Sequence, residues 1–204
     1  MKTHTKITQK NLTPQLAHQI LVEGNERFVQ NVKAQRNLKE QVLETSEGQY
    51  PFAVILSCID SRVPAELVFD QGIGDIFSIR LAGNIVNEDV LGSMEYGCKV
   101  AGSKIVVVMG HTKCGAVTAA CNHVELGNIT PLLEKIKPAV EVIESKSSTM
   151  DDDAIEEVSV LNVKLSIDRI RKESPILSSL EKEGTIEIIG ALYDVSTGKV
   201  DFFE

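Results

Sequence analysis

The pattern of apolar and polar residues separates a polar N-terminal part of the chain from a longer remainder. Residues 13–32 carry apolar side chains at roughly helical spacing: Leu16, Ile20, Leu21 and Phe28. Thr13 before Pro14 is a common start for a helix. A second, shorter helix is expected over residues 39–44. The pattern therefore predicts an N-terminal helical arm over residues 1–50.

From residue 51 onward, apolar runs alternate with amphipathic segments. Continuous apolar runs are typical of strands buried on both faces of a parallel sheet. Strands are predicted at residues 52–56, 76–80, 104–109, 186–193 and 200–203, and helices at 90–100, 115–121, 131–144 and 154–172. The last two strands read as a terminal hairpin. The alternation indicates an α/β domain over residues 51–204: a mostly parallel central sheet, with four parallel strands and a C-terminal antiparallel strand, flanked by helices.

The composition fits one structural domain and argues against nucleic acid and a membrane as partners. The chain has 204 residues, of which 43% are hydrophobic and 25% charged, as in an average globular protein. A net charge of −8 and the lack of Trp argue against a nucleic-acid partner. No apolar run reaches the length of about 18 residues that a membrane-spanning helix needs. The polar segment Met1–Asn11 does not resemble a secretory signal, so we expect a cytoplasmic protein.

The chain has four cysteines. In a reducing compartment disulfides are rare, so these cysteines are expected to be metal ligands, catalytic groups or buried thiols. Cys58 follows the predicted strand 52–56, and His111 and Cys114 follow the strand 104–109. In open α/β sheets, sites form at the carboxyl ends of strands. Catalytic zinc commonly takes three protein ligands and leaves a fourth position open. We predict that these three residues bind one Zn²⁺ ion. Alternatively, the two cysteines are small buried hydrophobic residues and the histidine caps a helix.

Two charged residues beside Cys58 favour the metal site. Asp60 and Arg62 follow at steps of two, so all three side chains can point the same way in an extended segment. A guanidinium partner keeps a carboxylate ionised. Asp60 is then able to accept a hydrogen bond from metal-bound water or to occupy the fourth position itself. Cys98 and Cys121 lie in helical patterns and are expected to be core thiols.

Two segments carry a resemblance to a known family. Residues 58–62 (CIDSR) and 110–115 (GHTKCG) resemble the signature segments of the β-class carbonic anhydrases, and the resemblance extends from Leu21 to Tyr193. It implies that the matching cysteines and histidine hold zinc and that the matching Asp and Arg form a dyad. It also implies substrate contacts from a further set of residues: Gln49, Phe77, Tyr96 and the backbone N–H of Gly115.

The resemblance implies an activity and an assembly. The expected reaction is reversible hydration of carbon dioxide to bicarbonate and a proton by a zinc-bound hydroxide, with Asp60 orienting the hydroxide and Arg62 holding Asp60. A homodimer or homotetramer is expected, with the arm packed over a neighbouring subunit. One bacterial subgroup has a Trp three residues before the first cysteine, in an inhibitory bicarbonate site; Ile55 stands there in this chain, which argues against bicarbonate inhibition.

Three other functions remain open on the residues alone. A zinc hydrolase of the same fold could act on carbon disulfide or carbonyl sulfide. A non-catalytic zinc protein would use Asp60 as a fourth, closing ligand for stability. A third alternative is redox sensing by Cys58 and Cys114. Arg62 and Gln49 favour the carbonic anhydrase reaction, because a closed structural site needs neither.

Overall fold

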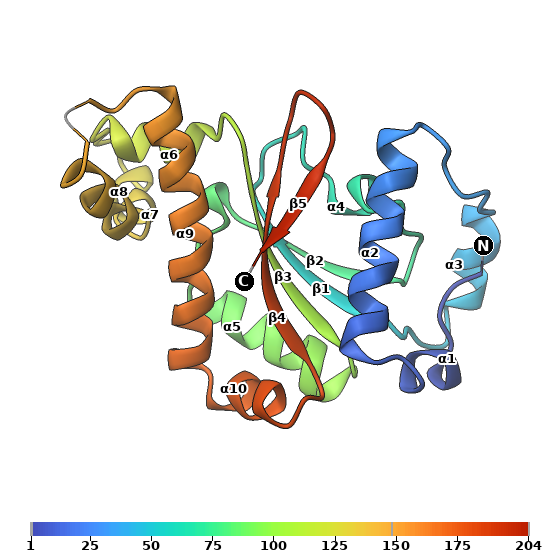
Figure 1. Cartoon of the computed structure of the whole chain (residues 1–204). Helices are drawn as coiled ribbons and strands as arrows, with labels where there is room; N and C mark the ends of the chain where they lie inside the picture. The colour runs from blue at the N-terminus through green and yellow to red at the C-terminus, as the bar shows by residue number, and fades with distance from the viewer. Residues whose placement is uncertain (1, 148, 204) are drawn as a thin grey trace.

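A five-stranded sheet runs through the centre of the molecule in the order β2-β1-β3-β4-β5 (Figure 1). The computed structural model describes residues 2–147 and 149–203. Its strands are β1 (Ala53–Ser57), β2 (Ile76–Arg80), β3 (Ile105–His111), β4 (Glu187–Tyr193) and β5 (Val200–Phe203). The first four are parallel, and β5 pairs antiparallel with β4. The predicted sheet of four parallel strands and one antiparallel strand is confirmed.

Each face of the sheet is covered by helices, because successive side chains of a strand point to opposite faces. Ala53 and Ile55 pack in one cluster with residues of α2 and α4. Val54 and Leu56 pack in the other with residues of α5, α9 and α10. These helices are α2 (Pro14–Val29), α4 (Ala65–Val68), α5 (Glu88–Glu95), α9 (Asp152–Glu173) and α10 (Pro175–Lys182). Both layers are visible in Figure 1.

The N-terminal arm packs on the sheet of its own chain. Thr13 caps α2 by accepting a hydrogen bond from the Leu16 amide, as the sequence predicts. Ala17 and Leu21 are fully buried in the core. A Cβ atom on Gly24 would lie 1.9 Å from the Phe69 carbonyl oxygen, so α2 approaches the end of α4 as closely as only glycine permits. Two short helices, α1 (Lys6–Lys10) and the expected α3 (Leu38–Glu44), accompany α2.

Several helix predictions need correction. The single helix predicted over residues 131–144 is two helices, α7 (Ile129–Leu133) and α8 (Lys137–Glu144). Pro138 stands in the first turn of α8, where its missing N–H costs nothing, whereas inside one long helix it would break a hydrogen bond. The helix predicted over 90–100 starts at Glu88 and passes at Tyr96 into a π-helical turn, Tyr96–Val100. α1 and α4 have five and four residues and are too short to show a periodic pattern. α10 is also missing from the predicted helices, although Ser174 and Pro175 mark its start and Leu177 and Leu180 form its buried face.

The carboxyl ends of the parallel strands lie beneath a small helical layer. α6 (Gly115–Cys121), α7 and α8 gather there with the N-terminal part of α9, at the upper left of Figure 1. Cys58 and Cys114 belong to the apolar cluster that these helices form with Ile136 and Val158. The predicted ligands are therefore covered on this side by packed aliphatic side chains.

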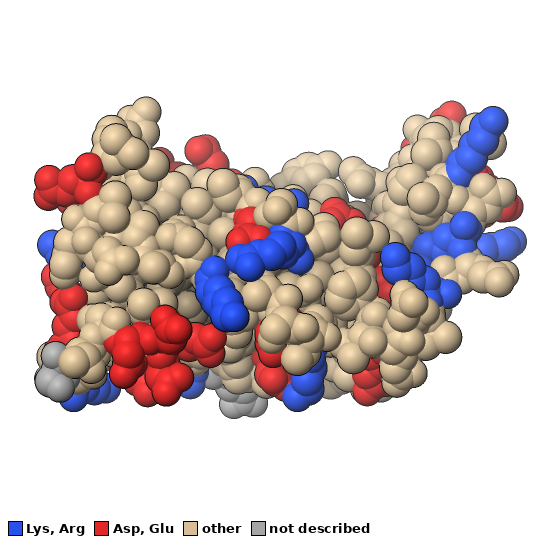
Figure 2. Space-filling view, turned by 90° about the horizontal axis from the view of Figure 1, so that it is seen from above, with Lys and Arg blue, Asp and Glu red and all other residues tan. Residues whose placement is uncertain are grey.

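The end of the molecule seen from above in Figure 2 carries acidic and basic side chains intermixed, with acidic groups gathered at one margin. Among the described residues on this face, basic side chains form no continuous stripe. In residues 2–147 and 149–203, no helix combines the length and the apolar character needed to cross a membrane.

Candidate metal centre

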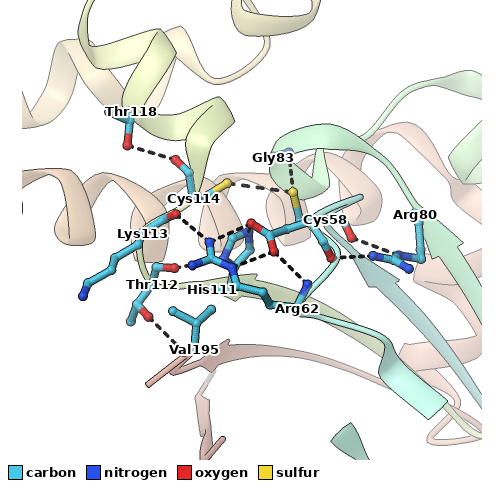
Figure 3. A network of polar contacts seen from close by, with 11 residues as sticks. Cys58, Arg62, Arg80, Gly83, His111, Thr112, Lys113, Cys114, Thr118 and Val195 are labelled. Carbon is cyan, nitrogen blue, oxygen red and sulfur yellow. Dashed lines mark hydrogen bonds and ion pairs between the residues drawn. The ribbon is translucent and has the colours of Figure 1, made fainter. Parts of the chain in front are cut away.

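Two adjacent strands bring the predicted zinc ligands together. Cys58 directly follows β1, His111 ends β3, and Cys114 precedes α6. Ser57, the last residue of β1, pairs with Met109, two residues before the end of β3, so Cys58 and His111 lie near the same edge of the sheet. The ligand atoms of the three side chains lie within 4.8 Å of one another, and all three residues are buried. Figure 3 shows them pointing toward one another from the two strand ends and the start of α6.

The spacing of the donor atoms fits zinc. The sulfur atoms of Cys58 and Cys114 are 3.9 Å apart. Two sulfurs each about 2.3 Å from a tetrahedral zinc ion would be about 3.8 Å apart. The observed separation is thus close to what a shared ion requires, and it is far longer than the roughly 2.05 Å of a disulfide.

The histidine ring is oriented as a metal ligand. Nδ1 of His111 lies 2.9 Å from the Thr112 carbonyl oxygen, so it carries the proton and donates. Nε2 is then left with a free lone pair, and it is buried without a hydrogen-bond partner among the described residues. An unpaired buried polar atom is costly unless something binds it. Metal-binding histidines typically donate their other ring N–H to a carbonyl or carboxylate, as His111 does.

Backbone amides surround both sulfurs. The Gly83 N–H donates to Sγ of Cys58 over 3.3 Å, and the amides of Ala116 and Val117 face Cys114. The contact between the sulfurs lowers the pKa of Cys58 to about 4, although burial opposes this. The same contact, together with burial, raises the pKa of Cys114. Without a cation, the pair therefore keeps one proton, and a metal ion that needs two thiolates would release it.

Asp60 and Arg62 form the predicted ion pair beside this cluster. Nε and Nη2 of Arg62 donate to the two carboxylate oxygens of Asp60 over 2.9 and 2.8 Å. The Arg62 amide donates to the same carboxylate. These bonds, which outweigh burial, lower the pKa of Asp60 to about 2. Oδ2 of Asp60 is 4.0 Å from Nε2 of His111, so an ionised carboxylate borders the metal cluster.

Arg80 has a role that the sequence did not reveal. Its Nε donates to the Cys58 carbonyl over 3.1 Å, and its Nη2 donates to the Asp60 carbonyl over 2.6 Å. The side chain thereby holds the backbone on both sides of Ile59. Figure 3 shows Arg80 reaching toward the backbone at Cys58. Arg80 is the last residue of β2 and lies within the region, Leu21 to Tyr193, over which the family resemblance extends. The sequence cannot indicate that this side chain reaches back to the segment after β1.

The predicted substrate-binding residues fall in two places. Gly115 directly follows Cys114 and begins α6, beside the metal cluster. Gln49 instead precedes β1, whereas Cys58 follows that strand, whose five residues span about 16 Å. Phe77 and Tyr96 have ring centroids 6.2 Å apart, and Tyr96 and Gln49 line one hollow. Within one chain, Gln49, Phe77 and Tyr96 lie near one another but are not brought to the metal cluster.

The remaining cysteines are core thiols, as expected. Cys98 packs with the residues of α5 and α9 beneath the sheet, and burial raises its pKa to about 12. Cys121 is buried beside α8, and burial, with Glu144 nearby, raises its pKa to about 11. Neither belongs to the metal-ligand group found among the described residues.

Comparisons with known protein families, sequences and structures all match carbonic anhydrases. The carbonic anhydrase family model matches residues 53–200. Carbonic anhydrase 2 of Mycobacterium tuberculosis is 33% identical over 202 residues, covering 93% of this chain and 92% of the relative. The crystal structure of a β-carbonic anhydrase of Aspergillus fumigatus matches with a TM-score of 0.74 and 29% identity over 81% of each chain. The Coccomyxa β-carbonic anhydrase in complex with acetazolamide matches with a TM-score of 0.73 and 25% identity, over 90% of this chain and 84% of that one.

Proposed function

Because the chain belongs to the β-class of the carbonic anhydrase family, we propose that it hydrates carbon dioxide reversibly with one zinc ion held by Cys58, His111 and Cys114. The resemblance to the β-class carbonic anhydrases is confirmed, and the chain is an enzyme of the carbonic anhydrase family. The observation that carries the zinc proposal is the buried Nε2 of His111, which lacks a hydrogen-bond partner among the described residues and faces two cysteine sulfurs.

Zinc, when bound, lowers the pKa of water and supplies hydroxide near neutral pH, as in carbonic anhydrases with three histidine ligands. Here two thiolates and one neutral imidazole, those of Cys58, Cys114 and His111, would hold the ion, and the thiolates would cancel its formal charge. The ligands therefore make the ion a weaker acid than three neutral histidines do. We expect activity that rises through mildly alkaline pH.

Asp60 and Arg62 orient the reacting groups. The Asp60 carboxylate is ionised, because hydrogen bonds from Arg62 lower its pKa to about 2. Its Oδ2 lies 4.0 Å from Nε2 of His111, so the carboxylate would hold a hydrogen-bond acceptor beside the ion. Arg62 fixes the direction of both carboxylate oxygens. The amide of Gly115 belongs to the first turn of α6, where backbone N–H groups have no partner within the helix and can face an oxyanion.

We also propose that the active assembly is a homo-oligomer, a dimer or a tetramer. Gln49, Phe77 and Tyr96 can act on the substrate only if a second copy of the chain brings them to the metal cluster of the first. Exposed apolar side chains on these parts of the molecule support this: Tyr96 is 54% and Val100 70% exposed, and Ile59, next to Cys58, is 61% exposed. Exposed apolar side chains that gather into patches often mark interfaces.

Zinc content and carbon dioxide hydration, measured together for the wild type and Cys114→Ser, test the proposed function. The wild type is expected to hold one zinc ion per chain and to be active. The variant is expected to lose zinc and activity together, because serine is a poor zinc ligand. Full activity without stoichiometric zinc would overturn the proposal. Sulfide release from carbonyl sulfide, followed in the same preparations, separates this reaction from that of a hydrolase.

A further inference from the structure

Asn162 connects the long helix α9 to the turn beside Cys58. Its side chain is 3% exposed, and its Nδ2 donates to the Gly83 carbonyl oxygen over 2.9 Å. The N–H of the same Gly83 donates to Sγ of Cys58 over 3.3 Å. Two consecutive hydrogen bonds therefore run from the interior of α9 to the sulfur of the first zinc ligand.

Both the backbone conformation and the close packing at position 83 require glycine. Its φ of +66° lies in the left-handed region, which only glycine adopts readily. A Cβ atom here would lie 2.6 Å from Cδ1 of Ile136 and 3.4 Å from Cβ of Ala116. The turn Ala82–Asn84 is therefore held against the helical layer on one side. Its glycine lacks a side chain, so the turn depends on backbone hydrogen bonds for its orientation.

We propose that Asn162 is a positioning residue for the zinc site, fixing Gly83 so that its N–H points at the Cys58 sulfur. The inference rests on the proposed zinc-dependent function. A hydrogen bond from an N–H group to a thiolate spreads the negative charge of the sulfur. It also fixes the direction in which the sulfur faces the metal. Arg80 already holds the Cys58 carbonyl, so the backbone of this ligand is fixed by Arg80 and its sulfur by Gly83. Partners one step removed from a metal ligand typically change metal affinity by about 10- to 100-fold when they are lost.

A purely structural role is the alternative. A buried carbonyl needs a donor whether or not it is near a metal, and Asn162 would then stabilise the fold without affecting zinc. Zinc affinity and thermal stability therefore have to be measured separately. Ile167 offers a control on the same helix: it is 3% exposed and packs against the sheet rather than against the turn.

The test uses the full chain as Asn162→Leu, Asn162→Asp and Ile167→Val. Leu has a similar size but no donor, and Asp keeps the shape while placing an acceptor against the Gly83 carbonyl. Zinc Kd is measured by competition with a chelator, and the melting temperature of the zinc-free protein is measured alongside. In Asn162→Leu and Asn162→Asp, Kd is expected to rise about 10- to 100-fold. In the cobalt-substituted protein, the sulfur-to-cobalt charge-transfer band is expected to shift. Ile167→Val should lower the melting temperature and leave Kd and the band unchanged.

Each outcome has a distinct meaning. Wild-type Kd and an unshifted band in Asn162→Leu, with a lowered melting temperature, would overturn the inference and leave only the structural role. An equal loss of zinc affinity in Ile167→Val would also overturn it. If Asn162→Leu does not fold, Asn162→Asp decides by the same two readouts. If the wild type itself binds no zinc, the proposed function fails, and this is distinguishable from failure of the Asn162 role alone.

Discussion

Asp60 is an ionised side chain that borders the metal cluster, and its position requires a group that accepts hydrogen bonds through both of its oxygen atoms. Both of its carboxylate oxygens accept hydrogen bonds from Arg62, and one of them is 4.0 Å from Nε2 of His111. An amide in its place could still meet the Arg62 side chain with its oxygen, but its NH2 group would face a donor. The charge that aligns the reacting hydroxyl group would also be lost.

Asp60→Asn is therefore expected to lower kcat for carbon dioxide hydration by about 10²-fold or more, the usual size of such a contribution. Zinc content should stay at the wild-type level, because Cys58, His111 and Cys114 are unchanged. Stopped-flow hydration assays and elemental analysis measure the two quantities. Asp168→Asn, which removes an exposed carboxylate from α9, is the matched control. Wild-type turnover in Asp60→Asn would contradict the role of Asp60.

Among residues, those that could be predicted from sequence are the ones that follow strands directly. Cys58 and His111 stand at the ends of two apolar runs, and the parallel arrangement of those runs was enough to place them together. Asn162 could not be assigned in this way. It is a buried polar residue in a helix with many apolar neighbours, which is a signal of some role, but its partner Gly83 is distant in the sequence. Pairings of this kind depend on how helices pack.

At the scale of elements, α2 is held to the molecule by a glycine contact and an ion-pair cluster. Strand alternation predicted both layers of helices, but it could not show that α2 lies on its own sheet. Gly24 explains the close packing of α2: because glycine has no Cβ atom, the helix can approach the Phe69 carbonyl. The break between α7 and α8 could have been predicted from Pro138, whereas the π-helical turn at Tyr96 has no comparable marker in the sequence.

Gly24→Ala is expected to lower the free energy of unfolding by about 3 kcal/mol, the upper part of the range for overpacked sites, because the new methyl group would overlap the Phe69 carbonyl. Gly92→Ala in α5 is the matched control. Nothing lies within 4 Å of a Cβ atom there, so it should raise stability by up to about 1 kcal/mol through helix propensity. Urea unfolding measures both. Equal effects of the two substitutions would show that α2 does not pack closely on α4.

Asp70 joins α2 to the segment that follows it. Its carboxylate is 2.6 Å from Nε of Arg27 and 2.6 Å from Nη1 of Arg36. Burial alone would raise the pKa of Asp70, but hydrogen bonds from Arg27, the Ala34 amide and Arg36 together lower it. A carboxyl group with a lowered folded-state pKa contributes stability above its unfolded pKa of about 3.9 and loses it as the pH falls toward the folded value.

Asp70→Asn is expected to cost roughly 3 kcal/mol of unfolding free energy at pH 7, the low end for a buried pair, because Arg27 is partly exposed. The difference from the wild type should narrow as the pH falls below about 4, because the unfolded wild-type chain then binds a proton at Asp70 while the folded carboxylate, with its lowered pKa, stays ionised. Urea unfolding between pH 7 and pH 3 measures this, again with Asp168→Asn as the control. A difference that stays constant across this range would contradict the electrostatic explanation.

At the scale of the whole molecule, the metal cluster and the group of Gln49, Phe77 and Tyr96 lie apart, and the proposed homo-oligomer predicts that Tyr96 acts on the metal cluster of another chain. Mixed oligomers of Cys114→Ser and Tyr96→Ala test this. In a mixed dimer, one site combines the intact ligands of the Tyr96→Ala chain with the intact Tyr96 of the other chain. Carbon dioxide hydration should therefore exceed that of either variant alone. Co-expression with two affinity tags isolates the mixed species. If Tyr96 acts within its own chain, mixing will restore nothing.

The order of strands also has a consequence for folding. β3 pairs with β4, which is synthesised much later than β3. The pairing runs from Ile105 with Glu187 at one end to His111 with Tyr193 at the other. Sheets assembled from such distant segments fold slowly, because long loops must close before the contacts form. The three ligand residues are all synthesised before α9 and β4, the elements that later cover them. A nascent chain thus carries its complete metal-binding set while one edge of β3 is still unpaired and exposed to aggregation.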